Sequence, residues 1–455
     1  MQRTPGAQVP TIGLFEVLRQ LRDPVGLLAK LGRRYEGATV RLQLRPGFAP
    51  YLVVDPNLVE QVWDRSDETY LRTGMMWEEL AKLQGRQGIG REGPDWKPSR
   101  ELLQPMFTPA RVREMYPAIA DAVQQSVGDL VRRARQSPKP VALVPAMKVI
   151  THTVLGKMFF GDRLSAEDAL RVGEAIDTSF QAMQSRVAMP GMPDWVPMPG
   201  DRAHRAAVRQ ADSIVKPLID AARAQPPSWD VISMLAHATL NDGTRVKTDL
   251  ARNNVVALFT GGTETTAMTL GWTFIALQEH PQIARRLQEE VDAVVGGPGN
   301  PVLPEHLERL EYTGMVLNEV LRLYPPAWML PRGVVQDDLL GHIPVHPGDT
   351  VIVSPYLTHR LASLWPEPDR FDPDRWKPGA RRPHKWAYLP FGGGVHRCVG
   401  AYLFRAEALL ALAALHTDLR IRIRAPRGTR PQGSISLQPR HQVYLDLAVR
   451  SARTS

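Results

Sequence analysis

The residue with the most distinctive chemistry is Cys398, because it is the single cysteine among 455 residues. It lies in a glycine-rich stretch that also holds a histidine, Phe391-Gly392-Gly393-Gly394-Val395-His396-Arg397-Cys398-Val399-Gly400. From Ala401 onward apolar residues recur at helical spacing, so we expect the thiol on a tight loop that leads into a helix. Free N–H groups and the dipole at a helix N-terminus stabilise a thiolate there.

An isolated cysteine is more often a small buried hydrophobe than a functional group. Here the glycines allow the backbone to approach a ligand closely, His396 adds a polar group, and Phe391 is a flat apolar cover for the sulfur. Without a second cysteine the chain forms no internal disulfide and no four-cysteine zinc or iron–sulfur site. A single thiolate can still serve as the axial ligand of a haem.

A second unusual stretch lies in the middle of a long helix that we expect from Lys247 to about His280. It is Thr260-Gly261-Gly262-Thr263-Glu264-Thr265-Thr266. Each glycine costs a helix interior about 1 kcal/mol relative to alanine, and a carboxylate among apolar residues is unfavourable unless it is wetted or paired. One explanation is a kink without function. The other is a helix that widens locally so that a ligand can lie against its backbone.

Two further pairs lie on predicted helices. Trp96 and Arg100 are one turn apart, so both face the same way, as in any amphipathic surface helix. Glu319 and Arg322 have the spacing of an ordinary helix ion pair, and Pro325-Pro326 ends their helix.

The cysteine loop resembles that of the cytochrome P450 family, the haem-thiolate monooxygenases. The pattern of that family is Phe-x-x-Gly-x-(Arg or His)-x-Cys-x-Gly. Every fixed position is filled here, by Phe391, Gly394, His396, Cys398 and Gly400. Thiolate ligation of haem is characteristic of this family.

Other stretches resemble the family in the same order along the chain, from Thr39 to Arg440. Residues 261–265 resemble its (Ala/Gly)-Gly-x-(Asp/Glu)-Thr motif, and Glu319-Val320-Leu321-Arg322 resembles its Glu-x-x-Arg helix. Residues 371–376 resemble its Phe-x-Pro-x-Arg-Phe meander, with Trp376 in place of the last phenylalanine.

The resemblance implies haem b (iron protoporphyrin IX) with Cys398 as its metal ligand, and Glu264 and Thr265 as a catalytic acid–alcohol pair beside dioxygen. It implies that Glu319 and Arg322 are a buried structural pair. The residues implied to bind the cofactor are Trp96, Arg100, Gly261, Gly262, Arg332, Phe391 and His396. Candidate substrate contacts, for which core packing is an equal alternative, are Ala327, Trp328 and Met329. The C-terminal turn adds Ser434 and Ile435 as weaker candidates.

The implied fold is one domain over residues 1–455, mainly α with small β-sheets (α+β), with the haem between the long distal helix and the helix after the cysteine loop. We expect β-rich parts near residues 38–55 and 327–356, and helical parts at 96–325 and 400–417. Local patterns agree, because residues 39–44 and 419–424 alternate polar and apolar side chains as strands do. Asp55-Pro56 is a typical helix start.

The bulk composition narrows the choice of partners. The chain carries 56 basic and 47 acidic residues, a net charge of +9, but the basic residues are dispersed and form no nucleic-acid motif. The N-terminal residues contain no long apolar run, which predicts no membrane anchor and a cytoplasmic location.

The proline-rich, apolar stretch at residues 189–200 excludes a regular helix. It is a buried loop or, in our preferred interpretation, a lid that admits apolar molecules.

The predicted function is a monooxygenase of secondary metabolism that inserts one atom of dioxygen into an apolar organic substrate. No flavin or nicotinamide segment is recognisable, so electrons are expected from a ferredoxin or flavodoxin and its reductase. A basic face formed by Arg375, Lys377, Arg381, Arg382, Lys385 and Arg397 would bind that acidic partner. The alternatives are an oxidative-coupling or peroxide-driven enzyme on the same scaffold, and a haem sensor or carrier without turnover.

Overall fold

The structure is a computed structural model that describes residues 9–20, 23–189, 192–380, 383–426 and 428–451. The chain divides into two compact units. Unit 1 comprises Met1–Glu78, Asn318–Cys398 and Arg430–Gln438, and unit 2 comprises Glu79–Leu317, Val399–Thr429 and Pro439–Ser455. The expectation of one domain over residues 1–455 stays a prediction, because compact units of a chain are not by themselves independent domains.

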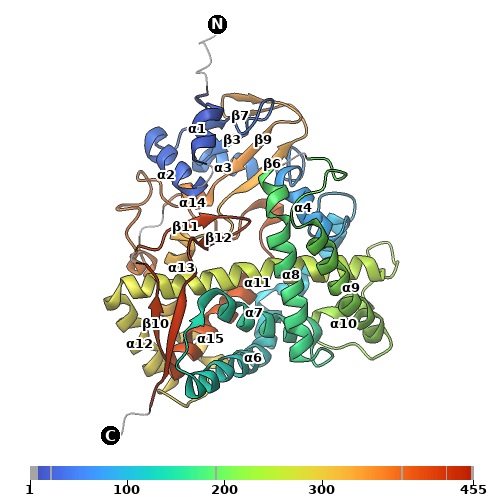
Figure 1. The fold of residues 1–455 in the computed structure, drawn as a ribbon. Coiled ribbons are helices and arrows are strands. Elements are labelled where there is room, and N and C mark those ends of the chain that lie inside the picture. Colours follow the sequence, from blue (N-terminus) through green and yellow to red (C-terminus); the bar gives the residue numbers. More distant parts are fainter. Residues whose placement is uncertain (1–8, 21–22, 190–191, 381–382, 427, 452–455) are drawn as a thin grey trace, which may run out of the picture. The chain divides into compact units, whose positions relative to one another are not determined.

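Unit 1 is built around a six-stranded sheet with the strand order β1-β2-β3-β9-β6-β4 (Figure 1). Its strands are β1 (Thr11–Ile12), β2 (Val40–Leu42), β3 (Tyr51–Val53), β4 (Tyr70–Leu71), β6 (Leu330–Val334) and β9 (Thr350–Val353). Val40 lies opposite Leu52 in the antiparallel β2–β3 pair, as the alternation of residues 39–44 predicts. β3 pairs in parallel with β9, so segments about 300 residues apart in the chain share one sheet.

The other elements of unit 1 are short. The hairpins are β7 (Asp338–Leu340) with β8 (Ile343–Val345) and β11 (Pro431–Gly433) with β12 (Leu437–Pro439). The helices are α1 (Leu14–Arg19), α2 (Pro24–Tyr35), α3 (Pro56–Asp64) and α14 (Pro355–Thr358), with 3₁₀ turns η3 (Pro373–Trp376), η4 (Lys385–Ala387) and η5 (Gly394–His396). Asp55 caps α3, as predicted, by accepting hydrogen bonds from the N–H groups of Asn57 and Leu58.

Unit 2 is mainly helical. Its helices are α5 (Trp96–Leu103), α6 (Pro109–Gln136), α7 (Leu143–Phe160), α8 (Ala166–Ala188), α9 (Asp201–Arg223), α10 (Val231–His237), α11 (Thr248–Glu279), α12 (Pro281–Val295) and α15 (Ala401–Asp418). The 3₁₀ turns are η1 (Gln104–Phe107) and η2 (Pro304–Arg309), and the sheet consists of β10 (Leu419–Arg424), β13 (Tyr444–Val449) and β5 (Val141–Ala142). Two helices, α4 (Met75–Gln84) and α13 (Glu311–Leu323), run across the boundary between the units.

The long helix α11 forms the centre of unit 2 (Figure 1). It begins and ends within a residue or two of the predicted bounds, and most of its residues are buried all round. A helix that is apolar on every side is buried on every side. α7 packs along α11, and a Cβ atom on Gly262 would lie 2.7 Å from Leu155 Cδ1.

The predicted helical part at 96–325 begins with two helices and not one. The structure ends α5 at Leu103 and begins α6 at Pro109. Pro105 has no N–H to donate, so the chain passes through the 3₁₀ turn η1 at this point. Thr108 then caps α6 through the N–H of Arg111.

The buried pair Glu319 and Arg322 holds the irregular chain of unit 1 in place. The two side chains have no exposed surface and share two hydrogen bonds, of 2.8 and 2.9 Å. Arg322 also donates to the carbonyl oxygens of His359, Pro368 and Arg370. Glu319 accepts from the Asp372 N–H and the Trp376 indole, so one ion pair ties α13 to the segment from residue 359 to 376.

His359 extends this connection to the chain before the cysteine loop. Its Nδ1 lies 3.1 Å from the Arg322 carbonyl oxygen, and its Nε2 accepts the Leu389 N–H at 2.9 Å. Nδ1 therefore carries the proton, and the ring is neutral. Burial lowers the pKa of His359 to about 3, because a charged ring would lose its solvation and the Leu389 bond.

Glycines shape the cysteine loop by allowing close packing. Gly392 and Gly394 have φ of +65° and +59°. A Cβ on Gly394 would lie 2.3 Å from the backbone oxygen of Trp63, and a Cβ on Gly393 would lie 2.1 Å from the ring of Trp386. No other residue fits at Gly393 or Gly394 without a shift of the neighbouring chain.

Among the described residues, no helix is both long and apolar enough to span a bilayer. The cytoplasmic location remains a prediction.

We predict that Glu319→Ala lowers the free energy of unfolding by about 3–5 kcal/mol, because it leaves the Arg322 guanidinium buried without its counter-charge. Glu311→Ala removes an exposed carboxylate from the same helix and should change that energy by no more than about 0.5 kcal/mol. Urea unfolding followed by circular dichroism measures both. Equal losses would show that the Glu319–Arg322 pair does not stabilise unit 1.

We predict that Gly394→Ala destabilises the protein more than Gly379→Ala does. Both glycines have positive φ, but a Cβ on Gly379 meets open space. Alanine should cost about 1–2 kcal/mol at each site for the backbone conformation, and the contact with Trp63 should add about 1–3 kcal/mol at Gly394. Denaturant midpoints of the two variants compare them directly, and coinciding midpoints would contradict the tight packing.

Candidate active site

The predicted site residues fall into two sets, one in each unit. Unit 1 holds Glu319, Arg322, Ala327, Trp328, Met329, Arg332, Phe391, His396, Cys398, Ser434 and Ile435. Unit 2 holds Trp96, Arg100, Gly261, Gly262, Glu264 and Thr265.

Cys398 follows the 3₁₀ turn η5 and is exposed in the structure. Its N–H donates to the Phe391 carbonyl oxygen at 2.9 Å, which closes the loop across seven residues. His396 lies within η5 and is half-buried, as is Phe391. α15 begins at Ala401, so the loop does lead into a helix as predicted. The thiol is thus held on a rigid turn and remains accessible to a ligand.

Arg332 is a buried cation on strand β6. Its side chain is held between two indole rings, with Cζ 4.5 Å from the centre of the Trp63 ring and 5.4 Å from that of Trp77. Trp77 and Arg332 both donate to the Pro331 carbonyl oxygen, at 2.8 Å each. Stacking on aromatic rings stabilises a desolvated guanidinium and orients it. A group with this charge and orientation suits a carboxylate ligand.

The candidate substrate contacts in unit 1 differ in burial. Trp328 belongs to the hydrophobic core, and its indole donates to the Ser434 carbonyl oxygen at 2.8 Å. Core packing therefore describes Trp328 better than substrate contact. Ala327, Met329 and Ile435 are half-buried.

Trp96 and Arg100 lie one turn apart on α5, as the spacing predicts. Trp96 is buried, whereas Arg100 is half-buried and donates to Gln104 Oε1 at 3.2 Å. α5 is fixed to the central helix by a hydrogen bond of 3.3 Å from Asn254 Nδ2 to Ser99 Oγ. This bond orients the helix that carries both residues.

The glycines of α11 have different surroundings. α11 is helical without interruption through this stretch. Gly262 is the contact point for Leu155, whereas a Cβ on Gly261 would meet no atom within 4 Å. Of these two glycines, Gly261 is the one that borders open space. The Thr265 hydroxyl donates to the Gly261 carbonyl oxygen at 2.6 Å, which holds the alcohol against this opening.

The carboxylate of Glu264 forms an ion pair with an ammonium group on another helix. Lys148 Nζ on α7 lies 2.7 Å from Glu264 Oε2 and 2.8 Å from Asp177 Oδ1 on α8. Glu264 is 4% exposed. The ion pair with Lys148 explains how a carboxylate is tolerated inside an apolar helix, because it compensates the lost solvation. The acid faces α7, whereas Thr265 is half-exposed on another side of α11.

Sequence reasoning did not identify Lys148 and Asp177. One signal was present, because Lys148 interrupts the apolar run from Leu143 to Ile150. A lysine in such a run needs a carboxylate partner as much as Glu264 needs a cation. Which partner each charge finds depends on how α7, α8 and α11 pack.

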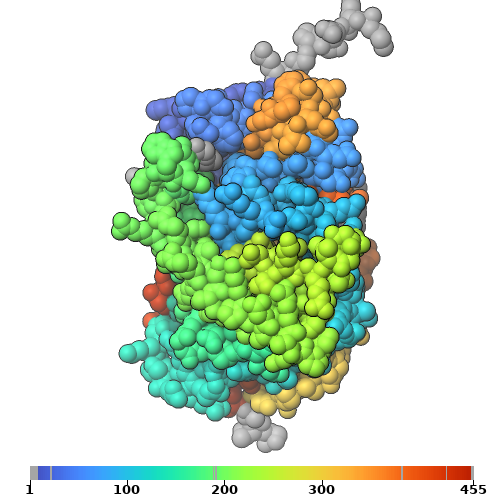
Figure 2. Space-filling view, turned by 90° about the vertical axis from the view of Figure 1, so that its right-hand side faces the viewer, coloured from blue at the N-terminus to red at the C-terminus, as the bar shows by residue number. Residues whose placement is uncertain are grey.

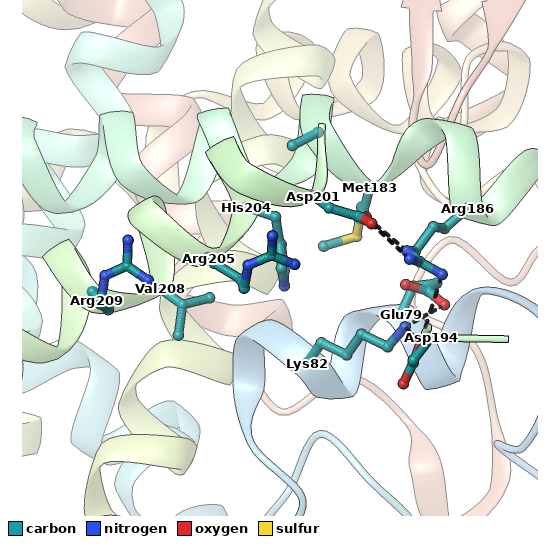
Figure 3. A pocket seen from close by; sticks show the side chains of 11 residues that line it. Glu79, Lys82, Met183, Arg186, Asp194, Asp201, His204, Arg205, Val208 and Arg209 are labelled. Atoms are coloured by element: carbon teal, nitrogen blue, oxygen red, sulfur yellow. Dashed lines mark hydrogen bonds and ion pairs between the residues drawn. The ribbon is translucent and has the colours of Figure 1, made fainter. Parts of the chain in front are cut away.

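The loop after α8 is held by charged side chains. Arg186 forms two hydrogen bonds of 2.7 Å with Asp201, and Lys82 binds Glu79 and Asp194 at 2.9 and 2.5 Å (Figure 3). The Arg186 guanidinium lowers the pKa of Asp201 through these bonds. Figure 2 shows this part of unit 2, in green and yellow-green, at the surface.

A pocket of about 430 Å³ lies beside the loop, and most of the residues that line it are charged. Figure 3 shows Lys82, Arg186, Asp194, Asp201 and Arg205 around it. The expectation that residues 189–200 form a lid for apolar molecules stays a prediction. Trp195 of the loop is 82% exposed. Residues 190–191 lie outside the described residues.

The side chains present suit a haem with one thiolate ligand. Cys398 supplies an accessible sulfur on a rigid turn, and Gly261 leaves room where a side chain would intrude. The guanidinium groups of Arg332 and Arg100 and the Trp96 indole N–H donate hydrogen bonds and do not accept them. They suit the two carboxylates of the cofactor, because an ionised carboxylate only accepts hydrogen bonds.

The comparisons with known proteins agree over nearly the whole chain. Residues 4–439 match the family model described as Cytochrome P450. The chain is 30% identical to "Cyclooctatin synthase" of Streptomyces melanosporofaciens, over 92% of this chain and 90% of the relative. It is 26% identical to "Pentalenene oxygenase" of Streptomyces avermitilis, over 98% and 97%. The crystal structure of the "cytochrome P450DA heme domain" matches with a TM-score of 0.85 at 23% identity, covering 97% of each chain.

These matches confirm the predicted fold class, mainly helical with small sheets, and the predicted type of enzyme. Membership in the matching family implies a haem with a cysteine thiolate ligand. The chain belongs to the cytochrome P450 family and is a P450 monooxygenase, an oxidoreductase.

Proposed function

We propose that this monooxygenase oxidises an apolar terpenoid. The observation that carries the proposal is the end-to-end similarity to two Streptomyces enzymes named for cyclooctatin and pentalenene, both terpenoid compounds. The reaction is the insertion of one atom of dioxygen, as hydroxylation or a related oxidation.

We propose Cys398 as the iron ligand. Its position on the turn closed by the Phe391 carbonyl supports this role, because a fixed thiolate holds a metal at a defined place. A haem bound through a thiolate supplies the oxygen activation that no amino-acid side chain can perform. Arg332, Arg100, Trp96 and His396 are proposed to bind its carboxylates.

The residues of α11 are proposed to handle protons and space. Gly261 leaves room for dioxygen, and the Thr265 hydroxyl is held beside that room by its bond to the Gly261 carbonyl. A hydroxyl can both accept and donate a proton, so Thr265 is suited to pass one to a bound ligand. Glu264 is the acid that precedes it in the chain, and its buried position keeps it out of bulk water.

Electrons are proposed to come from an acidic ferredoxin or flavodoxin and its reductase. Lys377, Lys385 and Arg397 in unit 1 are exposed and support a basic docking face. Arg375 does not belong to it, because its side chain is only 13% exposed and lies 3.4 Å from Glu319. Arg381 and Arg382 lie outside the described residues.

The substrate proposal is tested by adding terpene hydrocarbons and terpene alcohols to the purified haem-loaded protein and recording the haem spectrum. We expect some of them to shift the iron spin state, because an apolar substrate displaces water beside the iron. In the reduced, CO-bound form we expect the spectrum of a thiolate ligand, which Cys398→Ser should lose. Fatty acids and simple aromatics are the comparison compounds. Spin-state shifts from these alone would refute the terpenoid proposal.

For the electron donor, we predict that the double variant Lys377→Glu, Lys385→Glu slows reduction by a ferredoxin about tenfold at low ionic strength, and that added salt reduces the difference. Stopped-flow reduction of the haem measures the rate. The matched control is Arg245→Glu, Lys247→Glu, which reverses two exposed charges on the turn before α11. If both double variants behave alike, net charge explains the effect and the docking face is wrong.

A further inference from the structure

The charged pocket beside the loop after α8 is a cavity that the proposed oxygenation does not use. Its lining residues all belong to unit 2, and they come from α4, α8, α9 and that loop. None of them is a candidate contact of haem, dioxygen or substrate. A volume of about 430 Å³ is typical of a pocket that holds one small molecule.

The carboxylates of this pocket are already bound by two of its cations. Lys82 Nζ lies 2.9 Å from Glu79 Oε1 and 2.5 Å from Asp194 Oδ1. Arg186 forms two hydrogen bonds of 2.7 Å with Asp201 (Figure 3). Each acid in the pocket wall is therefore engaged by Lys82 or Arg186.

Two arginines of α9 remain, Arg205 and Arg209. They are four residues apart and exposed, so their guanidinium groups lie on the same face of the helix. Among the residues that the structure describes, neither forms a hydrogen bond or an ion pair. The pKa of Asp201 is lowered chiefly by its hydrogen bond with Arg186, and least by the charge of Arg205. Like charges at this spacing repel each other, and a bound anion would remove the repulsion.

Arg186 offers a further donor in the same wall. Its side chain is 7% exposed, and its Nη1 is buried without a hydrogen bond to any described residue. Asp194 Oδ1 lies 3.6 Å from this nitrogen, which is too far for a hydrogen bond. A buried donor without an acceptor is costly, so Nη1 calls for a partner that the protein itself does not supply.

The charges of the pocket favour an anion. It is lined by four cationic and three acidic side chains, a net charge of +1. His204 adds no charge at neutral pH, because burial lowers its pKa. Figure 3 shows Arg209, Arg205 and Arg186 in this order along the pocket. The donors thus follow one wall and do not surround a single point.

The kind of anion follows from the two uncommitted guanidinium groups. Guanidinium binds both carboxylates and phosphates through paired hydrogen bonds. A carboxylate carries one negative charge, whereas a phosphate ester carries about −1.5 to −2 at pH 7 and matches two cations better. Ala182, Met183 and Val208 complete the wall and are apolar, so they suit a hydrocarbon chain.

We propose that this pocket binds the phosphate ester of an apolar alcohol as a second ligand of the protein. The phosphate lies against Arg205 and Arg209, with Arg186 Nη1 as an additional donor, and the hydrocarbon chain lies against Met183 and Val208. No bond is made or broken at this site. The proposal does not depend on which molecule is oxidised.

The probe is decyl phosphate, added to the full-length, haem-loaded protein below the concentration at which it forms micelles. We expect calorimetry to show one site, with an affinity that falls as salt is added. Inorganic phosphate lacks the chain and decanol lacks the charge, so both should bind about tenfold more weakly or worse. Decanoate tests the charge of the head group. Equal affinity of any of these three compounds and decyl phosphate would overturn the proposed ligand class.

The double variant Arg205→Gln, Arg209→Gln should raise the Kd of decyl phosphate about tenfold or more, because it removes both charged donors. The matched control is Arg133→Gln, Arg135→Gln, which removes two exposed arginines from α6 outside the pocket. The control should keep the wild-type Kd. An unchanged Kd in the pocket variant, or an equal rise in both, would overturn the site.

Two further measurements separate this site from other places where the probe could bind. Decyl phosphate in the pocket should leave the haem spectrum unchanged. A spin-state shift that persists in Arg205→Gln, Arg209→Gln would place the probe beside the haem and overturn the proposal. Binding of the protein to phosphatidic acid vesicles, without binding of monomeric decyl phosphate, would identify a membrane surface as the partner and overturn it as well.

Discussion

The need to neutralise buried charge organises both units of this protein. In unit 1, Glu319 and Arg322 are fully buried, and their remaining hydrogen-bonding groups bind backbone from residue 359 to 376. That stretch is short of regular structure and could not otherwise satisfy its polar groups without water. His359 carries the connection on to Leu389, just before the cysteine loop. The position of the thiol in unit 1 thus depends on one ion pair.

The same constraint acts differently in unit 2. The carboxylate of Glu264 forms an ion pair with Lys148, which Asp177 also binds. Glu319 and Arg322 are matched one to one and rigid, as a structural pair requires. The Lys148 ammonium contacts two carboxylates instead of one, and the exposed fraction of their side chains falls from 19% at Asp177 to 5% at Glu264.

Close packing is the second condition for the site. Gly393 and Gly394 let the cysteine loop lie directly on Trp63 and Trp386. Arg332 in turn stacks on the rings of Trp63 and Trp77. Gly262 has a comparable role in unit 2, where it brings α7 against α11. This close approach of α7 is what places Lys148 within reach of Glu264. Packing of apolar surfaces therefore decides where the charges meet.

The sequence by itself determined the family, the order of the elements, and the identity of the thiol, because these depend on local patterns such as the loop around Cys398 and the apolar run of α11. It also indicated that Glu264 must be either wetted or paired. Only the tertiary structure decided that the partner is Lys148, that Gly261 and Gly262 have different surroundings, that Arg375 is turned inward, and that Trp328 belongs to the core. The physical reason is that ion pairing and packing join residues far apart in the chain, whereas spacing along the chain shows only what lies on one helix face or one strand.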